Sequence, residues 1–313
     1  SGKIFGNSTA IKPLFHDNKI ISLSQSAFPQ YSESDPYKMA ASSINTAVKN
    51  LIVMGANSKK IAILDNFCWC SSDEPERLYE LKEAAKACFD YAVAYNTPFI
   101  SGKDSMYNDF KGFNQKGKDT KISILPTLLI SSIGIVDSIN HLTKISPEID
   151  DQIYVLGNTS NELNKSEYDN LFGIKKSNTP SVKAEESLEL YKKFEKANKK
   201  KLFSSALGVD LGGIGVTLIK MSIGSNFGLN INIPKNNKLN MDQFLFSESQ
   251  SRIIVSVKKK NEKIFKKLFN KSFYTKIGIC TGDDKVNFNY SGNKYSDTIL
   301  NFSKSYKNNI KGL

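Results

Sequence analysis

The chain has 313 residues, 40% of them hydrophobic, and a formal net charge of +12. This length and apolar content suit two globular domains and exclude a disordered or fibrous protein. No apolar run reaches the roughly 20 residues that span a bilayer, and no secretory signal pattern is present, so we expect a cytoplasmic protein with no membrane partner.

The positive charge lies mostly in lysines late in the chain. Between residues 258 and 273, Ile264, Phe265, Leu268 and Phe269 recur at helical spacing, and lysines fill the gaps. This pattern is typical of an amphipathic helix with a solvated basic face. No nucleic-acid recognition motif accompanies the charge, so we expect no nucleic-acid partner.

The four cysteines are too few and too irregularly spaced for a disulfide framework or a paired zinc site. The two histidines are isolated from them in the sequence. We therefore expect reduced thiols.

The first half of the chain alternates helical and strand patterns, which indicates an α/β or α+β domain. The expected elements are a helix over 36–51 that Gly55 stops, a strand over 60–65, a helix over 74–95, a strand over 97–101 and a strand over 127–136. In the helix over 74–95, one face should carry the apolar residues Leu78, Leu81, Ala85, Cys88, Phe89 and Ala92.

A polar connection over 137–151, which contains Pro147, breaks this periodicity. We therefore predict two domains, over residues 1–147 and 148–313. The expected elements of the second domain are a strand over 152–157, a helix over 181–201, a glycine-rich segment over 208–215 that leads into a helical run, and strands over 228–233 and 251–257.

Polar residues follow two of the predicted strands. Asp65 ends one strand, and Gly102-Lys103-Asp104-Ser105 follows the next. A glycine there lets backbone N–H groups approach a phosphate, Lys103 adds a charge and Ser105 a hydroxyl donor. Asp104 or Asp65 could hold the magnesium that bridges nucleotide phosphates. The pattern alone equally allows a tight turn whose polar residues satisfy backbone groups.

A second candidate is the pair Gly212-Gly213, which precedes a helical run. Unpaired amides and the helix dipole at such a point can bind an anion. Double glycines before helices are more often turn and packing devices, so this signal is weak.

Several motifs, taken in order, resemble the second synthetase-like half of the phosphoribosylformylglycinamidine synthase family. The segments Leu64–Trp69 and Pro98–Ser105 are the specific ones. The others are Asp35–Tyr37, Pro126–Ser131, Ser166–Tyr168, Gly212-Gly213 and Leu245–Ser249. The resemblance extends over nearly the whole chain.

The resemblance implies an α/β (α+β) synthetase module of the aminoimidazole ribonucleotide synthetase kind. Its N-terminal domain would pair with a like domain to close a β-barrel, and a C-terminal α/β domain would lie beside it. The implied activity is an ATP-dependent ligase of purine biosynthesis. It converts formylglycinamide ribonucleotide and ammonia from glutamine into formylglycinamidine ribonucleotide, with ATP and magnesium as cofactors.

The resemblance also assigns residues. Asp65 and Gly102 correspond to nucleotide contacts, with Lys103 beside them, and Ser105 to a substrate contact. For magnesium the candidates are Asp104, from the pattern above, and Asn50, which matches a metal-binding asparagine.

Three positions depart from the family pattern. Thr46 stands where a glutamate is expected, and Lys103 where smaller members have a magnesium-binding asparagine. Leu207–Asp210 replaces a His-Asp-x-Ser segment. These departures weaken the site built within this half, and no catalytic residue is assigned.

The expected partners are the first synthetase-like module and a glutaminase domain or subunit, because neither histidine has the neighbours of a glutaminase triad. We therefore expect this chain to be part of a longer protein, inactive alone and able to form a homodimer. The alternative is a non-catalytic structural or auxiliary nucleotide-binding module whose site has decayed. A free-standing aminoimidazole ribonucleotide synthetase fits the motifs less well.

Overall fold

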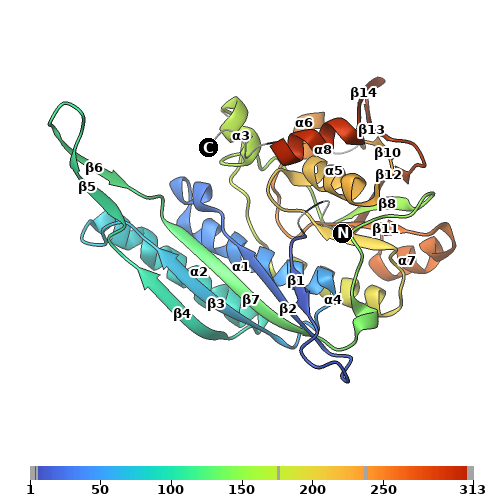
Figure 1. Ribbon diagram of the computed structural model, residues 1–313, viewed down its shortest axis with the longest axis horizontal. Coiled ribbons are helices and arrows are strands. Elements are labelled where there is room, and N and C mark those ends of the chain that lie inside the picture. Colours follow the sequence, from blue (N-terminus) through green and yellow to red (C-terminus); the bar gives the residue numbers. More distant parts are fainter. Residues whose placement is uncertain (1–3, 5, 175–176, 236–238, 309–313) are drawn as a thin grey trace.

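The computed structural model describes residues 4, 6–174, 177–235 and 239–308, which form two mixed α/β parts (Figure 1). The first contains a five-stranded sheet with the order β1-β2-β7-β3-β4. Its elements are β1 (Thr9–Ile11), β2 (Ile20–Ser26), α1 (Pro36–Met54), β3 (Ile61–Cys68), α2 (Pro75–Tyr95), β4 (Phe99–Ser105) and β7 (Thr127–Val136). The expected mixed fold class is confirmed.

Helix α1 begins and ends as its sequence predicts. The Asp35 side chain caps the first turn by accepting a hydrogen bond from the Lys38 N–H at 3.0 Å, and Pro36 occupies the first helical position. Gly55 ends the helix in the left-handed conformation, with φ 117°. Helix α1 is buried along nearly its whole length because it lies between the sheet and the second domain.

Helix α2 has the predicted bounds but a different buried face. Leu78 and Phe89 are 54% and 69% exposed and Ala85 is exposed as well, so the apolar face predicted from the sequence is not the face that packs inward. The residues that pack inward are Ala84, Ala87, Cys88, Tyr91 and Tyr95. The error arose because small alanines and amphipathic tyrosines, rather than the largest apolar residues, form the contact with α1.

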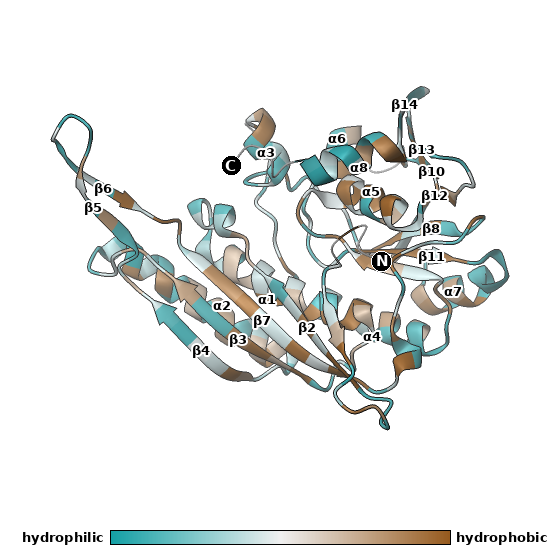
Figure 2. Ribbon diagram, viewed as in Figure 1, coloured by the Kyte–Doolittle hydropathy of each residue, from teal (hydrophilic) through white to brown (hydrophobic). Residues whose placement is uncertain are grey.

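The sheet of the first domain is covered on one face only. Helices α1 and α2 lie on that face, behind the strands in Figure 1. In β7, Leu128, Ile130 and Ser132 are buried beneath the helices, and the alternate residues, such as Leu129 and Ile133, are only half-buried. Figure 2 shows that β7 is more apolar than the edge strand β4.

A hairpin of β5 (Asp109–Phe113) and β6 (Asp119–Ser123) projects from this sheet as an arm (Figure 1). The sequence analysis missed it. At its base Asp109 accepts a hydrogen bond from the Ser71 N–H at 3.0 Å, and its hydrogen bonds with Ser71 hold the pKa of Asp109 at about 2. Along the arm, Phe110 and Ile122 are cross-strand partners and both are exposed.

The second part contains a seven-stranded sheet with the order β14-β13-β10-β12-β8-β11-β9. Its strands are β8 (Gln152–Leu156), β9 (Ser205–Gly208), β10 (Leu229–Asn232), β11 (Ile253–Val257), β12 (Tyr274–Cys280), β13 (Lys285–Tyr290) and β14 (Asn293–Thr298). Its helices are α3 (Glu167–Phe172), α4 (Ala184–Lys199), α5 (Gly213–Ser225), α6 (Met241–Phe246), α7 (Glu262–Phe269) and α8 (Ile299–Asn308).

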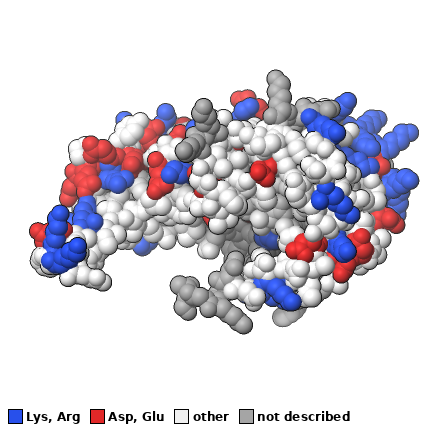
Figure 3. All heavy atoms as spheres, turned by 90° about the horizontal axis from the view of Figure 1, so that it is seen from above, with Lys and Arg blue, Asp and Glu red and all other residues white. Residues whose placement is uncertain are grey.

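Helix α7 is amphipathic, as predicted. Phe265 and Phe269 are fully buried, whereas Ile264 is 53% exposed and does not belong to the inner face. The lysines Lys263 and Lys266 are exposed on the other side. Basic side chains accordingly gather at the end of the molecule where α7 lies, on the right in Figure 3.

The two parts share one apolar core. Residues of α1 such as Ile44 and Leu51 belong to the same buried cluster as Tyr154 of β8 and Phe194 of α4. A second cluster lies on the other face of the seven-stranded sheet, around α5. The domain boundary expected between residues 147 and 148 stays a prediction.

Candidate functional site

The parallel strands β3 and β4 place Asp65 directly beside Gly102. A Cβ atom on Gly102 would lie 2.1 Å from the Asp65 Oδ1 atom, far inside van der Waals contact. Gly102 therefore leaves room for the Asp65 carboxylate. The sequence analysis brought these residues together correctly, but for a different reason.

The segment Gly102–Ser105 lies within β4 instead of following it, so both its placement after the strand and the tight-turn alternative are wrong. Because side chains alternate along a strand, Asp104 shares the helix-covered face with Asp65, while Lys103 and Ser105 share the open face. The five expected ligand residues of this strand pair thus divide between two faces of the sheet.

Asp65 and Asp104 form a close acidic pair. Burial raises the pKa of the Asp65 carboxyl, and the charge of Asp104 raises it further. Burial also raises the pKa of the neighbouring Cys88 thiol to about 12, with a smaller contribution from Asp65. Within the described ranges, neither carboxylate forms an ion pair. The pair is a concentration of negative charge without a neutralising side chain.

Ser105 is held at the base of the hairpin. Its carbonyl accepts hydrogen bonds from the Trp69 N–H at 2.7 Å and from the Asn108 Nδ2 atom at 2.7 Å. Its hydroxyl donates to the Asn108 Oδ1 atom at 3.2 Å. The two specific sequence motifs, Leu64–Trp69 and Pro98–Ser105, are therefore neighbours in the sheet.

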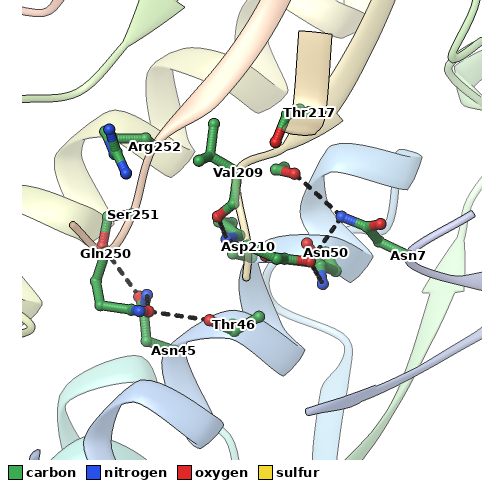
Figure 4. A network of polar contacts seen from close by, with 12 residues as sticks. Asn7, Asn45, Thr46, Asn50, Val209, Asp210, Thr217, Gln250, Ser251 and Arg252 are labelled. Carbon is green, nitrogen blue, oxygen red and sulfur yellow. Dashed lines mark hydrogen bonds and ion pairs between the residues drawn. The ribbon is translucent and has the colours of Figure 1, made fainter. Parts of the chain in front are cut away.

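Asn50 lies elsewhere, on the face of α1 that packs against β9 of the second domain. Its Nδ2 atom donates to the Asp210 Oδ2 atom at 3.1 Å (Figure 4). Asp104, by contrast, lies on the edge strand β4. The structure thus keeps the two expected magnesium ligands apart, so they do not form one metal site. Among the described residues, no cluster of three or more His, Cys, Asp or Glu side chains could hold a metal ion.

A second polar network joins α1 to the loop before β11. Thr46 Oγ1 donates to the Gln250 Oε1 atom at 3.0 Å, and Asn45 Nδ2 donates to the same oxygen at 3.2 Å (Figure 4). The Asn45 Oδ1 atom accepts hydrogen bonds from the Tyr95 and Tyr191 hydroxyls at 2.8 and 2.7 Å. Sequence reasoning named Thr46 only as a departure from the family pattern, and it missed the others because nothing in the pattern showed that α1 faces the second domain.

Gln250 also borders a polar cavity of about 360 Å³ in the second domain. The cavity lies between the loop after β8, the start of α4 and the loop before β11. Serine side chains contribute much of its lining, namely Ser160, Ser181, Ser187, Ser249, Ser251 and Ser272.

The Gly212-Gly213 segment is already occupied by a carboxylate of the protein. Glu248 Oε1 accepts hydrogen bonds from the Gly212 N–H at 2.8 Å, at the start of α5, and from the Glu167 N–H at 3.0 Å, at the start of α3. The Glu248 Oε2 atom accepts one from the Tyr31 hydroxyl at 2.5 Å. Because Glu248 is fully buried, its carboxylate fills the anion position that the helix start offers.

Two family models match the chain in order. The N-terminal domain of AIR synthase related proteins matches residues 7–136, and the C-terminal domain matches residues 149–291. The architecture is thus that of a two-domain synthetase-like α/β module. With both of its domains present, the chain belongs to the family of AIR synthase related proteins.

Curated relatives carry the name phosphoribosylformylglycinamidine synthase subunit PurL. The subunit from Thermococcus sibiricus is 32% identical over 77% of this chain and 33% of its own length. The subunit from Leuconostoc mesenteroides is 27% identical over 97% of this chain and 39% of its own length. The chain therefore spans only a third to two fifths of these relatives.

Solved structures confirm the fold. Thermotoga maritima PurL complexed with FGAR superposes with a TM-score of 0.76, at 15% identity, over 95% of this chain and 48% of that one. The same protein complexed with ATP gives a TM-score of 0.68, at 15% identity, over 91% and 44%. Among the residues that the structure describes, no helix combines the length and the hydropathy needed to cross a membrane.

Proposed function

We propose that this chain is one synthetase-like module of an ATP-dependent ligase that converts formylglycinamide ribonucleotide and ammonia into formylglycinamidine ribonucleotide. The observation that carries the proposal is its similarity, over most of the chain and in both domains, to PurL subunits of phosphoribosylformylglycinamidine synthase. In this reaction the amide oxygen takes the terminal phosphoryl group of ATP and ADP is released. Ammonia then adds to the amide carbon, and phosphate leaves with that oxygen. We place the protein in the cytoplasm, where its four free cysteines would stay reduced.

The open sheet face supports a partner module. Leu23, Leu129 and Ile133 lie on a face that neither α1 nor α2 covers, and Leu23 is 40% exposed. Apolar sheet surfaces of this kind are normally covered in proteins. A second synthetase-like module would cover this one and close the barrel. Lys103 and Ser105 share the same face, so they would be directed towards the substrate shared by the two modules.

The acidic pair on the other face suits a nucleotide with magnesium. Magnesium prefers oxygen ligands and is usually held through one or two carboxylates together with phosphates. Asp65 and Asp104 supply two carboxylates without a cationic partner among the described side chains, so they would hold the ion beside Gly102. Bound magnesium would neutralise phosphate charge.

Replacing Asp104 by asparagine should weaken magnesium-dependent ATP binding about tenfold, or about 1.4 kcal/mol, because one of the two carboxylates is lost. Calorimetric titration of the reassembled enzyme measures this. Asp119→Asn, an exposed acid on the hairpin, is the matched control and should bind as the wild type does. Equal dissociation constants in all three proteins would remove Asp104 from the site.

The chain alone should show no synthase activity with formylglycinamide ribonucleotide, ATP and ammonium, because the residues proposed to bind ligands would form only part of a two-module site. Adding the separately expressed first module should restore turnover with ammonium, and adding the glutaminase subunit should restore turnover with glutamine. Phosphate release coupled to product formation measures both steps. Turnover by the pure chain would show that it is a self-sufficient enzyme.

One observation favours a non-catalytic role for this chain. The polar positions between its two domains are filled by side chains of the chain itself: Glu248 lies at the helix starts, and Lys49 pairs with Asp210. A structural or auxiliary nucleotide-binding module with a decayed site would look the same there. The two functions are separated by the Asp104→Asn enzyme, because a purely structural module would lose neither ATP binding nor turnover.

A further inference from the structure

The junction between α1 and the second domain contains a fully buried lysine. Lys49 has no exposed surface, and its Nζ atom donates to the Val209 carbonyl at 2.5 Å and to the Asp210 Oδ1 atom at 2.6 Å. It precedes Asn50, the residue that the resemblance assigns to magnesium. The ammonium and the amide of these neighbours contact the two oxygens of the same carboxylate.

The charges at this junction oppose a divalent cation. Asp210 is the carboxylate here, and Lys49 already pairs with it. Asn7 Nδ2 donates to Asp210 Oδ2 at 2.7 Å, and the Lys220 Nζ atom donates to Asn7 Oδ1 at 3.0 Å. The Asp210 carboxylate therefore has two ammonium groups near it, those of Lys49 and Lys220. A magnesium ion would add two further positive charges without a further anionic ligand.

The position at which the family pattern has a glutamate offers no carboxylate either. Thr46 lies one turn before Asn50 on α1, and its hydroxyl donates to Gln250 instead of supplying a carboxylate (Figure 4). Figure 4 shows Asp210, Asn50 and Asn7 together as one cluster, and Thr46 and Gln250 as a separate one.

Strand β9 packs closely against Lys49 and Asn50. A Cβ atom on Gly208 of β9 would lie 2.4 Å from Asn50 Oδ1 and 3.0 Å from Lys49 Cε. Strand β9 thus lies directly against these two side chains. Magnesium usually keeps several waters, and it requires near-octahedral geometry. Asn50 Oδ1 has no hydrogen-bond partner among the described residues, yet a single amide oxygen cannot compensate for the missing anionic ligands.

We propose that the Lys49 ammonium takes the place of a divalent cation at this junction, so that an internal ion pair joins α1 to the second domain and no magnesium binds there. The expectation that Asn50 is a magnesium ligand is thereby replaced. The inference rests on the proposed function only in taking magnesium as the ion replaced, and its test uses neither nucleotide nor substrate. Failure of the ligase proposal would leave the results below unchanged.

Manganese titration of a chain that carries both Asp65→Asn and Asp104→Asn tests the absence of the metal, because this variant lacks both carboxylates of the acidic pair proposed to bind magnesium elsewhere. We expect no stoichiometric Mn²⁺ binding at millimolar concentration, by the paramagnetic resonance signal of the free ion. The melting temperature should be the same in EDTA and in magnesium. One Mn²⁺ bound per chain, lost on Asn50→Leu substitution, would overturn the proposal.

Lys49→Met tests the ion pair, because it keeps the length of the side chain and removes its charge. We expect the melting temperature to fall by at least about 5 °C, since the partly buried Asp210 carboxylate loses its fully buried partner. Lys60→Met is the matched control: its ion pair with Asp137 has the similar length of 2.7 Å but is exposed, and the expected shift is below about 2 °C. A Lys49→Met chain that melts like the wild type would overturn the proposal.

A charge-conserving variant covers the case in which Lys49→Met does not fold. Lys49→Arg retains the positive charge, so the folded variant should remain insensitive to magnesium and EDTA. Magnesium-dependent stabilisation of Lys49→Arg by several degrees would show that a metal competes for this position, and the proposal would fail.

Discussion

Replacing Gly102 by valine is expected to lower the synthase activity of the reassembled enzyme at least tenfold and to destabilise the chain by about 2 kcal/mol. The loss of stability follows from the steric conflict between any Cβ at this position and the Asp65 carboxylate. The loss of activity follows from displacement of that carboxylate. Steady-state kinetics and denaturant unfolding measure the two effects.

A double-mutant cycle separates packing from function. Gly102→Ala should destabilise the wild-type chain, but it should be nearly neutral in a chain that carries Asp65→Ala, because the conflicting oxygen is then absent. Activity should remain low in the double variant, since the carboxylate is still missing. If the two substitutions act additively on stability, Gly102 is not there to accommodate Asp65.

Replacing Ile133 by glutamate is expected to abolish self-association of the isolated chain. Ile133 lies on the open sheet face between Leu23 and Ala62, its cross-strand partners. We expect the wild-type chain to dimerise through this face, burying more than about 1,200 Å² in total. A glutamate there would be buried without a partner, which should weaken the dimer at least about 100-fold, or about 2.7 kcal/mol.

Analytical ultracentrifugation over a concentration series measures this dissociation constant. Ile264→Glu is the control, because Ile264 is an exposed apolar residue on α7 of the other domain and should leave the dimer intact. A wild-type chain that remains monomeric at the highest concentration would contradict the pairing, and so would a dimer unaffected by Ile133→Glu.

The sequence predicts those elements whose local signals agree with their packing. Helix α1 has a capping aspartate, a proline in its first turn and a terminal glycine, so its bounds follow from local chemistry. Strand β7 is a long apolar run rich in β-branched residues, and its predicted and observed bounds are the same. The hairpin of β5 and β6 was missed because each of its strands is only five residues long and carries an aspartate and a lysine. Its signal is the alternation of Phe110 with Lys111 and of Lys121 with Ile122.

The candidate site was predictable only in part. The meeting of Asp65 and Gly102 follows from two neighbouring strands, but the separation of Asp104 from Lys103 depends on β4 continuing to Ser105. The role of Lys49 could not be predicted, because a lysine on an otherwise apolar helix face has no local signature of its partner. Only the packing of β9 against α1 reveals Asp210.

The shared apolar core has a consequence for how the molecule unfolds. Side chains of α1 and α2 pack in one continuous cluster with those of α4, β8 and β11, and the Tyr95 and Tyr191 hydroxyls meet at a single amide oxygen of Asn45. Neither half of this cluster is enclosed without the other. We therefore expect the elements that share this cluster to unfold as one cooperative unit, in which a cavity opened beneath α4 in the second domain would loosen the strands that carry Asp65 and Gly102 in the first.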